Sequence, residues 1–274
     1  MSSAKRKWAV VTGASAGLGV EFARQLARKG YDLVLTARRR DRLETLAAEI
    51  ERDAKVSTVV LESDLSVAGA SAALVRELEE RGIEVELLVN NAGVGLHGEA
   101  LAMPIDRLSA MIQLNVTALV ELSIALGAKM AARGSGAILN VSSTASFQPN
   151  PYFAVYGATK AFVTSFSLAL AREVGPRGVR VLAHCPGPTR TEFNDVADMS
   201  ASAGDWLYMS AERCVAIGLS ALERGRWLKV TGLLNAVAAF FSRRSPMWLA
   251  TIVTGQMMRP TRPPKSLPAG PGAP

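Results

Sequence analysis

The sequence contains only two cysteines, Cys185 and Cys214, among 274 residues. This scarcity excludes a disulfide framework and a cysteine-rich metal site, and it fits a reducing compartment. The two histidines, His97 and His184, show no metal-ligand spacing, so no bound metal is expected. The first residues lack the apolar core of a signal peptide, and no apolar run reaches the roughly 20 residues of a membrane-spanning helix. These absences predict a cytoplasmic protein.

Acidic residues are scarce at the C-terminal end. Residues 222–274 hold eight Lys or Arg and one acid, Glu223, whereas the remaining chain holds 23 basic and 23 acidic residues. The net charge of +7 therefore comes entirely from the last fifth of the chain. No interleaved aromatic or helix-turn-helix pattern accompanies it, so no nucleic-acid partner is expected. A basic segment rich in apolar residues favours a membrane surface or an anionic substrate.

Short apolar runs alternate with amphipathic stretches along most of the chain. The runs predict buried strands at residues 8–12, 32–36, 56–61, 85–90, 137–142 and 179–183. The stretches between them predict helices at residues 18–29, 39–53, 68–81 and 105–132, and from about Tyr156 to Gly175. This alternation predicts an α/β fold: a single doubly wound Rossmann domain with a parallel sheet covered by helices on both faces.

A glycine-rich turn follows the first expected strand. Gly13, Gly17 and Gly19 stand where that strand gives way to a helix. Without Cβ atoms, the backbone N–H groups of such a turn can approach a pyrophosphate at the helix N-terminus. The spacing is Gly-x3-Gly-x-Gly rather than the commoner Gly-x-Gly-x2-Gly. The turn therefore predicts a dinucleotide cradle.

The end of the second expected strand indicates which dinucleotide is bound. Proteins that prefer NAD place an acid there to hold the ribose 2′-hydroxyl. Here the sequence reads Thr36-Ala-Arg-Arg-Arg40, which offers no acid. Arg38, the first residue after the strand, could bind a 2′-phosphate with two hydrogen bonds. The predicted cofactor is therefore NADP(H).

Three side chains form a candidate catalytic set. Tyr156 and Lys160 are four residues apart on one expected helix, so they share a face. A free phenol has a pKa near 10, and a nearby ammonium group is expected to lower the pKa of Tyr156. Ser143 lies thirteen residues before Tyr156 and can donate a hydrogen bond to a substrate oxygen. Together they predict proton transfer to or from a carbonyl or alcohol oxygen.

With these motifs in order, residues 7–231 resemble the short-chain dehydrogenase/reductase family, in its single-domain branch. The resemblance rests also on Asn90-Asn-Ala-Gly93, Asn115 and Pro186-Gly187 with Thr191. It implies that Asn115 bends its helix and joins Ser143, Tyr156 and Lys160 as a catalytic residue, and that Trp227–Val230 is a seventh strand. It also implies a cofactor-binding set of Gly13, Ser15, Gly17, Leu18, Gly19, Arg38, Asp64, Leu65, Asn91, Ala92, Gly93, Tyr156, Lys160, Pro186, Gly187, Thr189 and Thr191.

The chain continues beyond the length of compact relatives. We expect a catalytic domain at 1–231, an apolar helical extension at 232–259 and a proline-rich, disordered tail at 260–274. Within the extension, residues 232–241 and 247–258 are apolar, and Ser242 to Pro246 predict a turn with a serine N-cap and a proline at the first helical position. The extension resembles those of steroid-, retinoid- and long-chain acyl-active relatives. It could form a subunit interface, a substrate cap or an interfacial membrane anchor.

The sequence thus predicts an NADP(H)-dependent oxidoreductase that transfers a hydride between nicotinamide and a carbonyl or secondary alcohol on an apolar small molecule. A homo-oligomer, dimer or tetramer, is expected, with membrane contact through 232–259 as a further role. Two other functions remain open: a non-catalytic NADP(H)-binding sensor or scaffold, and a peripheral membrane protein. The complete Ser143, Tyr156 and Lys160 set disfavours the sensor, which does not need all three.

Overall fold

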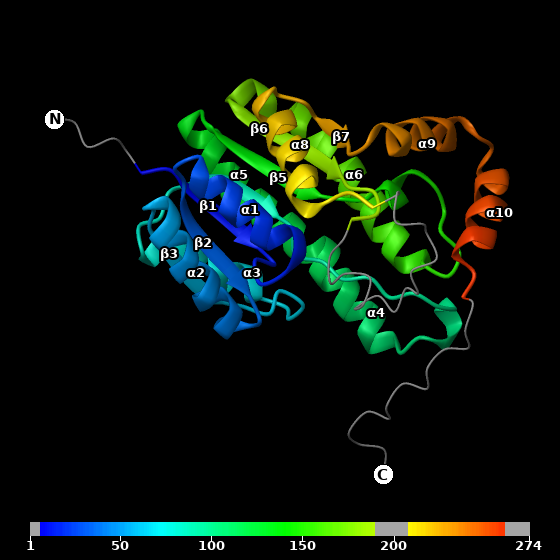
Figure 1. Cartoon of the computed structure of the whole chain (residues 1–274), viewed down its shortest axis with the longest axis horizontal. Helices are drawn as coiled ribbons and strands as arrows, with labels where there is room; N and C mark the ends of the chain where they lie inside the picture. Colours follow the sequence, from blue (N-terminus) through cyan, green and yellow to red (C-terminus); the bar gives the residue numbers. More distant parts are fainter. Residues whose placement is uncertain (1–5, 190–207, 261–274) are drawn as a thin grey trace, which may run out of the picture.

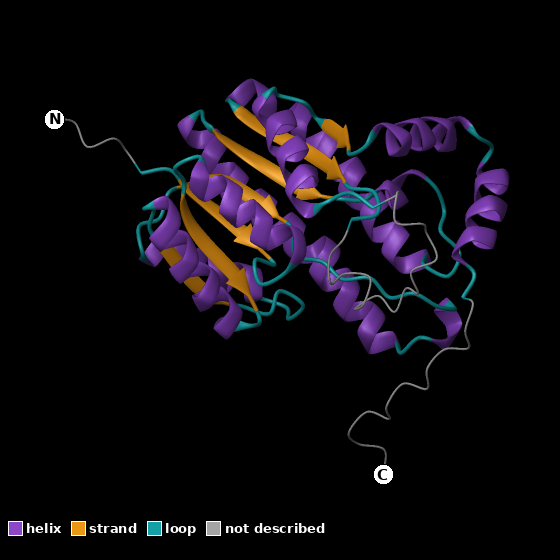
Figure 2. Ribbon diagram, in the orientation of Figure 1, coloured by secondary structure: helices purple, strands orange, loops and turns teal. Residues whose placement is uncertain are grey.

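A computed structural model describes residues 6–189 and 208–260 of the chain. Its centre is a seven-stranded parallel sheet in the order β3-β2-β1-β4-β5-β6-β7 (Figures 1 and 2). The strands are β1 (Trp8–Thr12), β2 (Asp32–Ala37), β3 (Thr58–Glu62), β4 (Val85–Asn90), β5 (Gly136–Val141), β6 (Val179–Cys185) and β7 (Leu228–Val230). The strand order reverses direction between β1 and β4, the place where ligands of open α/β sheets bind.

Helices cover both faces of the sheet. One face packs against α1 (Gly17–Arg28), α2 (Arg40–Ala54) and α8 (Ala211–Glu223), whose buried residues include Phe22, Leu43 and Leu219. The other packs against α3 (Ala70–Glu80), α5 (Ala118–Arg133) and α6 (Ala154–Val174), with Leu78, Leu122 and Leu170 in the core. At ~1.5–3 kcal/mol for each large apolar side chain fully buried, these two layers supply most of the driving force for folding. The predicted doubly wound fold is confirmed.

The helix predicted at residues 105–132 is interrupted near its middle. It consists of α4 (Ile105–Ile112), a π-helical turn at Gln113–Thr117 and α5. Asn115 lies inside the π turn and is buried. Such turns widen the helix by one residue and commonly occur at functional sites. The helical distortion implied at Asn115 is therefore present.

Two continuous helical stretches are long and apolar enough to cross a membrane by length and composition, contrary to the sequence expectation. They are Ile105–Arg133 and Ala154–Arg177, and 44% and 50% of their most apolar windows are buried inside the protein. Both lie against the sheet: α5 contacts β4, β5 and β6, and α6 contacts β5 and β6. Their hydropathy reflects this burial in the core of the Rossmann fold.

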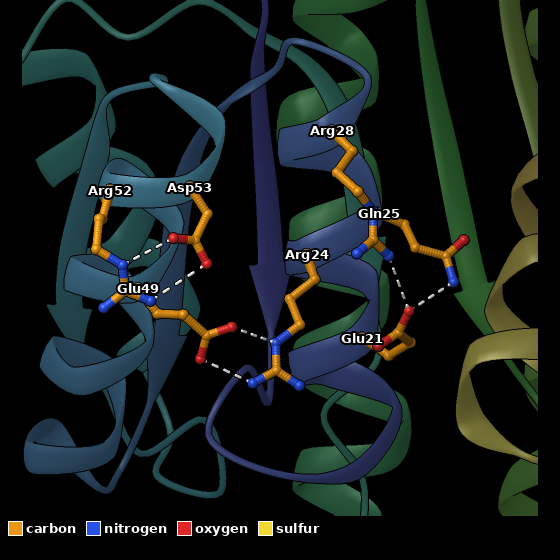
Figure 3. A network of polar contacts seen from close by, with 7 residues as sticks. All are labelled: Glu21, Arg24, Gln25, Arg28, Glu49, Arg52 and Asp53. Atoms are coloured by element: carbon orange, nitrogen blue, oxygen red, sulfur yellow. Dashed lines mark hydrogen bonds and ion pairs between the residues drawn. The ribbon is translucent and has the colours of Figure 1, made fainter.

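An ion-pair network joins α1 to α2 on the outer face of the sheet (Figure 3). Arg24 donates two hydrogen bonds to Glu49, at 2.7 and 2.8 Å. Because both side chains are about one third exposed (40% and 32%), the pair contributes about 1 kcal/mol or less. The pair links α1, which begins at the glycine turn, to α2.

The C-terminal segment forms two short helices, α9 (Leu233–Arg244) and α10 (Met247–Met258). They lie at the end of the molecule toward which the strands point (Figure 2). The predicted turn was wrong in its details: α9 continues through Ser242, and only Ser245 and Pro246 separate the helices. Ser245 donates its hydroxyl back to the Phe241 carbonyl (3.0 Å) rather than capping α10, and Pro246 occupies the N-cap position.

Candidate active site

The glycine turn is held against the end of β4 by a compact hydrogen-bond network. Asn91 donates its side-chain amide to the carbonyls of Thr12 (2.9 Å) and Gly13 (3.2 Å). The Thr12 hydroxyl in turn accepts from the N–H groups of Asn91 and Ala92, at 3.0 and 2.9 Å. These bonds pin the two loops that meet at the reversal of strand order. The sequence singled out Asn91 and Ala92 but gave no role to the Thr12 side chain.

The turn requires glycine on steric grounds. Gly13 and Gly17 have φ values of 66° and 56°, in the left-handed region that other residues rarely adopt. A Cβ on Gly19 would lie only 2.1 Å from the Gly13 carbonyl oxygen. The first turn of α1 therefore packs directly on the loop and leaves backbone N–H groups at its N-terminus. This is the geometry of a phosphate cradle.

Arginines lie at the end of β2, beside the cradle. Arg38 is largely exposed and lies 3.9 Å from the Asp64 carboxylate. Arg39 instead turns toward the glycine loop and donates to the Ser15 hydroxyl at 3.3 Å. The sequence pattern pointed to Arg38 and gave no role to Arg39. The run of three arginines was the only indication that Arg39 could take part. Two cations and a serine hydroxyl thus converge where a 2′-phosphate is expected.

Asp64 and Leu65 follow β3 on the same side. Burial alone would raise the pKa of Asp64, but hydrogen bonds from the hydroxyl and backbone N–H of Ser66, with Arg38 nearby, hold that pKa below its ordinary value. Leu65 is buried in the core beneath. Leu18, at the start of α1, packs against the opposite core layer. Because the side chains of Leu18 and Leu65 pack toward the core, the backbone near these residues is the part that a ligand can contact.

Ser143, Tyr156 and Lys160 come together beyond the carboxyl end of β5. Ser143 lies two residues after the end of β5, and Tyr156 and Lys160 lie one turn apart on α6. Ser143 hydrogen-bonds with the Tyr156 phenol, and the Lys160 ammonium lies 5.7 Å from the centre of the Tyr156 ring. Lys160 also donates to the Val141 carbonyl at 2.9 Å. The sequence spacing therefore placed these three groups correctly in one cluster.

The neighbouring Ser142 is engaged elsewhere. Its buried hydroxyl donates to the Lys160 carbonyl at 2.8 Å and shares a hydrogen bond with the Thr164 hydroxyl at 2.7 Å. Ser142 thus fastens β5 to α6, and Ser143 is the serine that faces Tyr156. The offset of thirteen residues before Tyr156 selected the same serine.

The protonation of the cluster differs from the sequence expectation. Burial raises the pKa of Tyr156 to about 12, against a smaller lowering by the hydrogen bond with Ser143. Burial also lowers the pKa of Lys160 to about 8. The predicted lowering of the Tyr156 pKa was wrong for this structure, because burial of the phenol raises its pKa more than the hydrogen bond with Ser143 lowers it. At neutral pH the phenol is therefore protonated.

Asn115 and Gly93 complete this side of the site. Asn115 exchanges hydrogen bonds with the backbone of Val94, at 2.9 and 3.0 Å, and donates to the Thr159 hydroxyl at 3.1 Å. A Cβ on Gly93 would lie 3.2 Å from Asn115 and 3.3 Å from the Lys160 ammonium. The loop after β4 and the π turn therefore meet at Lys160.

The loop after β6 forms the opposite wall. The Pro186 carbonyl accepts from the N–H of Thr144 (2.9 Å), and the Thr189 hydroxyl donates to the Gly187 carbonyl (2.9 Å). Gly187 lies against the Asn235 side chain, which would block a Cβ at 2.1 Å. Thr191 lies outside the described residues. Pro186, Gly187 and Thr189 thus lie beside the segment that carries Ser143.

An aromatic stack that the sequence did not reveal supports Tyr156. Phe153, three residues earlier, stacks on the Tyr156 ring with centroids 4.2 Å apart. His97 meets the edge of Phe153 and donates its Nε2 hydrogen to the Met258 carbonyl at 2.8 Å. The only sequence signal was the spacing of three residues on one helix face. His184, Cys185 and Cys214 are buried structural residues, and burial lowers the pKa of His184 to about 4.

Comparisons with known proteins point to the family that the sequence motifs resemble. Residues 7–200 match the family described as short chain dehydrogenase. The very-long-chain 3-oxoacyl-CoA reductase-A of Danio rerio is 30% identical over 251 residues, which cover 90% of this chain and 74% of that protein. The very-long-chain 3-oxoacyl-CoA reductase of Laccaria bicolor is 38% identical over 65% of this chain but only 53%, about half, of its own length.

Among solved structures, a short-chain dehydrogenase from Sphingobium yanoikuyae in complex with NADPH superposes with a TM-score of 0.79. It is 32% identical, and the match covers 95% of this chain and 98% of that one. Fold, motif order and site geometry agree with the match over residues 7–200. The chain belongs to the short-chain dehydrogenase family.

Proposed function

We propose that this protein is an NADP(H)-dependent oxidoreductase that reduces a carbonyl group on an apolar molecule, or oxidises the matching secondary alcohol. The observation that carries the proposal is the cluster of Ser143, Tyr156 and Lys160. It lies at the same edge of the sheet as the glycine cradle. When bound, the nicotinamide supplies or accepts the hydride. The side chains of this cluster transfer the proton and hydrogen-bond the substrate oxygen.

Tyr156 acts as the proton donor in the reductive direction. With its pKa raised to about 12, the phenol is protonated at neutral pH and can protonate the alkoxide that a carbonyl becomes. Ser143 hydrogen-bonds the same oxygen, where negative charge develops. Lys160 is mostly charged below its pKa of about 8, so it stabilises the phenolate left behind and can hold the nicotinamide ribose. In the oxidative direction the same residues act in reverse.

The residues around the cradle fit NADP(H). The absence of an acid at the end of β2 removes the usual partner of the NAD ribose. Arg38 and Arg39 supply the cations, and Ser15 supplies a hydroxyl, for a 2′-phosphate. Asp64, Leu65, Asn91, Ala92 and Gly93 are proposed to line the adenine and ribose, and Pro186, Gly187, Thr189 and Thr191 the nicotinamide.

The substrate class is proposed from two sources. The Danio rerio relative is named for a long acyl substrate, and helices α9 and α10 bring apolar side chains beside the loop that contains Ser143. A long acyl chain, a steroid or a retinoid would match that apolar character. Residues 1–231 are the proposed catalytic domain, and 232–259 the extension that serves it.

The proposed assembly is a cytoplasmic homo-oligomer, a dimer or tetramer, that also contacts a membrane surface peripherally. Exposed Ile124 on α5 and Phe162 on α6 support self-association, because they leave apolar surface on neighbouring helices. The two free, buried cysteines fit a reducing compartment.

The test is a panel of apolar and short-chain carbonyls with NADPH, and of the matching alcohols with NADP, followed by the absorbance of the reduced nicotinamide. Tyr156→Phe should remove nearly all turnover while NADPH binding stays close to parental. Tyr31→Phe, on the opposite side of the fold from the cluster, is the matched control and should behave like the parent. If Tyr156→Phe kept more than a few per cent of the activity, the mechanism proposed here would be wrong.

A further inference from the structure

Helices α9 and α10 lie at one end of the molecule (Figure 1), and they carry many exposed apolar side chains. Most of the exposed large apolar side chains of the described residues lie in this segment. Leu233, Leu234, Phe241, Trp248, Ile252 and Met257 are each more than half exposed. A patch of this extent marks an interaction site in a folded protein.

The exposed apolar side chains cover a broad face of α10, which includes Trp248, Leu249, Ile252, Val253 and Met257. The opposite face, with Thr254, Gly255 and Met258, is half-buried against the rest of the protein. Against the described part of the chain, α10 buries none of its twelve residues. The apolar interior of a bilayer can cover a face of this breadth in one contact.

The charges beside the surface are of one sign. Residues 224–274 contain no Asp or Glu. Arg243 and Arg244 end α9 and lie over the rings of Phe147 and Phe240, at 5.6 and 3.7 Å from the ring centroids to the guanidinium carbons. Arg259 follows the last residue of α10. Cations at the rim of an apolar surface match the phosphates that border the apolar interior of a bilayer.

A shallow groove beside α9 is also lined by both apolar side chains and arginines. It has a volume of about 580 Å³, and Phe147, Val230 and Phe240 lie along it with Arg243 and Arg244. Two copies of the chain meeting through this surface would join two cationic surfaces whose arginines find no acid within residues 224–274, which is electrostatically unfavourable. The charge pattern therefore favours an anionic surface over a second copy.

The surface is tied to the loop between Ser143 and Tyr156. The Ser242 hydroxyl donates to the Gln148 side chain at 3.1 Å, and the Thr254 hydroxyl donates to the Pro149 carbonyl at 2.8 Å. His97 joins the Met258 carbonyl to the Phe153 ring that stacks on Tyr156. We propose that α9 and α10 form a docking surface for an anionic phospholipid bilayer, which holds the candidate active site beside the lipid.

The test is co-sedimentation of the full chain with vesicles of phosphatidylcholine alone or mixed with phosphatidylserine. The parent should bind the mixed vesicles more tightly, and added salt should weaken that binding. Trp248→Glu with Ile252→Glu should abolish binding. Arg243→Gln with Arg244→Gln should weaken binding to the mixed vesicles by about fivefold for each arginine.

Matched controls separate this surface from general effects of charge. Val67→Glu with Ile112→Glu alters two side chains that are 57% and 44% exposed, against 66% and 52% for Trp248 and Ile252. Arg28→Gln with Arg52→Gln removes two exposed arginines from α1 and α2. Both control pairs should bind vesicles like the parent.

Failure of a folded parent to bind either vesicle would overturn the proposal, as would equal binding by the test and control variants. If Trp248→Glu with Ile252→Glu instead dissociates an oligomer that does not bind vesicles, the surface is a subunit interface and the lipid assignment is wrong. Vesicle binding needs neither cofactor nor substrate, so its failure would leave the proposed hydride transfer untouched.

Discussion

Replacing Lys160 with methionine should abolish turnover while leaving the free energy of unfolding unchanged or higher. Burial lowers the pKa of Lys160 from 10.5 to about 8. Keeping this side chain charged in the folded protein at pH 7 therefore costs on the order of 3 kcal/mol. Methionine fills similar space without the charge. It leaves the Val141 carbonyl without its 2.9 Å partner, which costs about 1–3 kcal/mol. The expected net change is about 0 to 2 kcal/mol of added stability.

The pH dependence tests the cause of that change. As pH rises above about 8, folded Lys160 loses its proton while the unfolded chain keeps its own until pH 10.5. The unfolded state then binds more protons, so the stability of the parent rises by up to about 1.4 kcal/mol per pH unit. The methionine variant lacks this gain, and its advantage should shrink. Tyr156 has the opposite effect on stability, because burial raises its pKa to about 12 in the folded protein. This effect begins only above pH 10, where the phenol of the unfolded chain loses its proton while the folded one keeps it.

Urea unfolding of the parent and the variant between pH 7 and about pH 9.5 would measure the difference in the free energy of unfolding and its dependence on pH. Lys129→Met is the matched control, since the Lys129 side chain is 49% exposed and paired with Glu79 at the surface. The control should change stability little and show no such trend with pH. A Lys160→Met variant that is several kcal/mol less stable at pH 7, or a difference from the parent that stays constant with pH, would refute the reasoning.

Four further substitutions probe the cradle and the substrate side. Ser143→Ala should lower kcat by roughly 10²-fold or more with little change in NADPH binding, because it removes one hydrogen bond to the developing charge; unchanged kcat in steady-state assays would exclude that role. Arg38→Ala and Arg39→Ala should each reduce NADPH affinity by about 1.5–3 kcal/mol in titration calorimetry and leave NADH affinity nearly constant, and equal losses for both cofactors would argue against a 2′-phosphate contact. Gly19→Ala should abolish binding of both cofactors in the same titration, because its Cβ would lie 2.1 Å from the Gly13 carbonyl oxygen; parental affinity would show that the turn tolerates the displacement.

The sheet and the catalytic cluster could be predicted from the sequence because both depend on local patterns. Apolar runs gave the strands to within one or two residues, and helical periodicity put Tyr156 and Lys160 on one face. The protonation of Tyr156 could not be predicted, because burial depends on how the whole fold closes around α6. Likewise, three successive arginines do not reveal that Arg39 alone turns toward Ser15.

The C-terminal helices show the limits of local signals. Their existence and length followed from two apolar segments, but the boundary between them did not. Ser242 to Arg244 have the polar character of a turn, yet they extend α9 because Arg243 and Arg244 cover aromatic rings and Ser242 bonds to Gln148. These are tertiary contacts, which outweigh the weak local preference for a cap.

Helix α10 contributes only twelve residues and no buried side chain to the described fold. Helices shorter than about 12–15 residues are marginal in water unless packing supports them. Its backbone amides should therefore exchange hydrogen through local opening, whereas those of α6 should exchange only when the whole domain unfolds. Ordering of α10 and docking of its apolar side chains are then one coupled equilibrium. The measured free energy of binding to a surface is the favourable free energy of contact reduced by the cost of forming the helix.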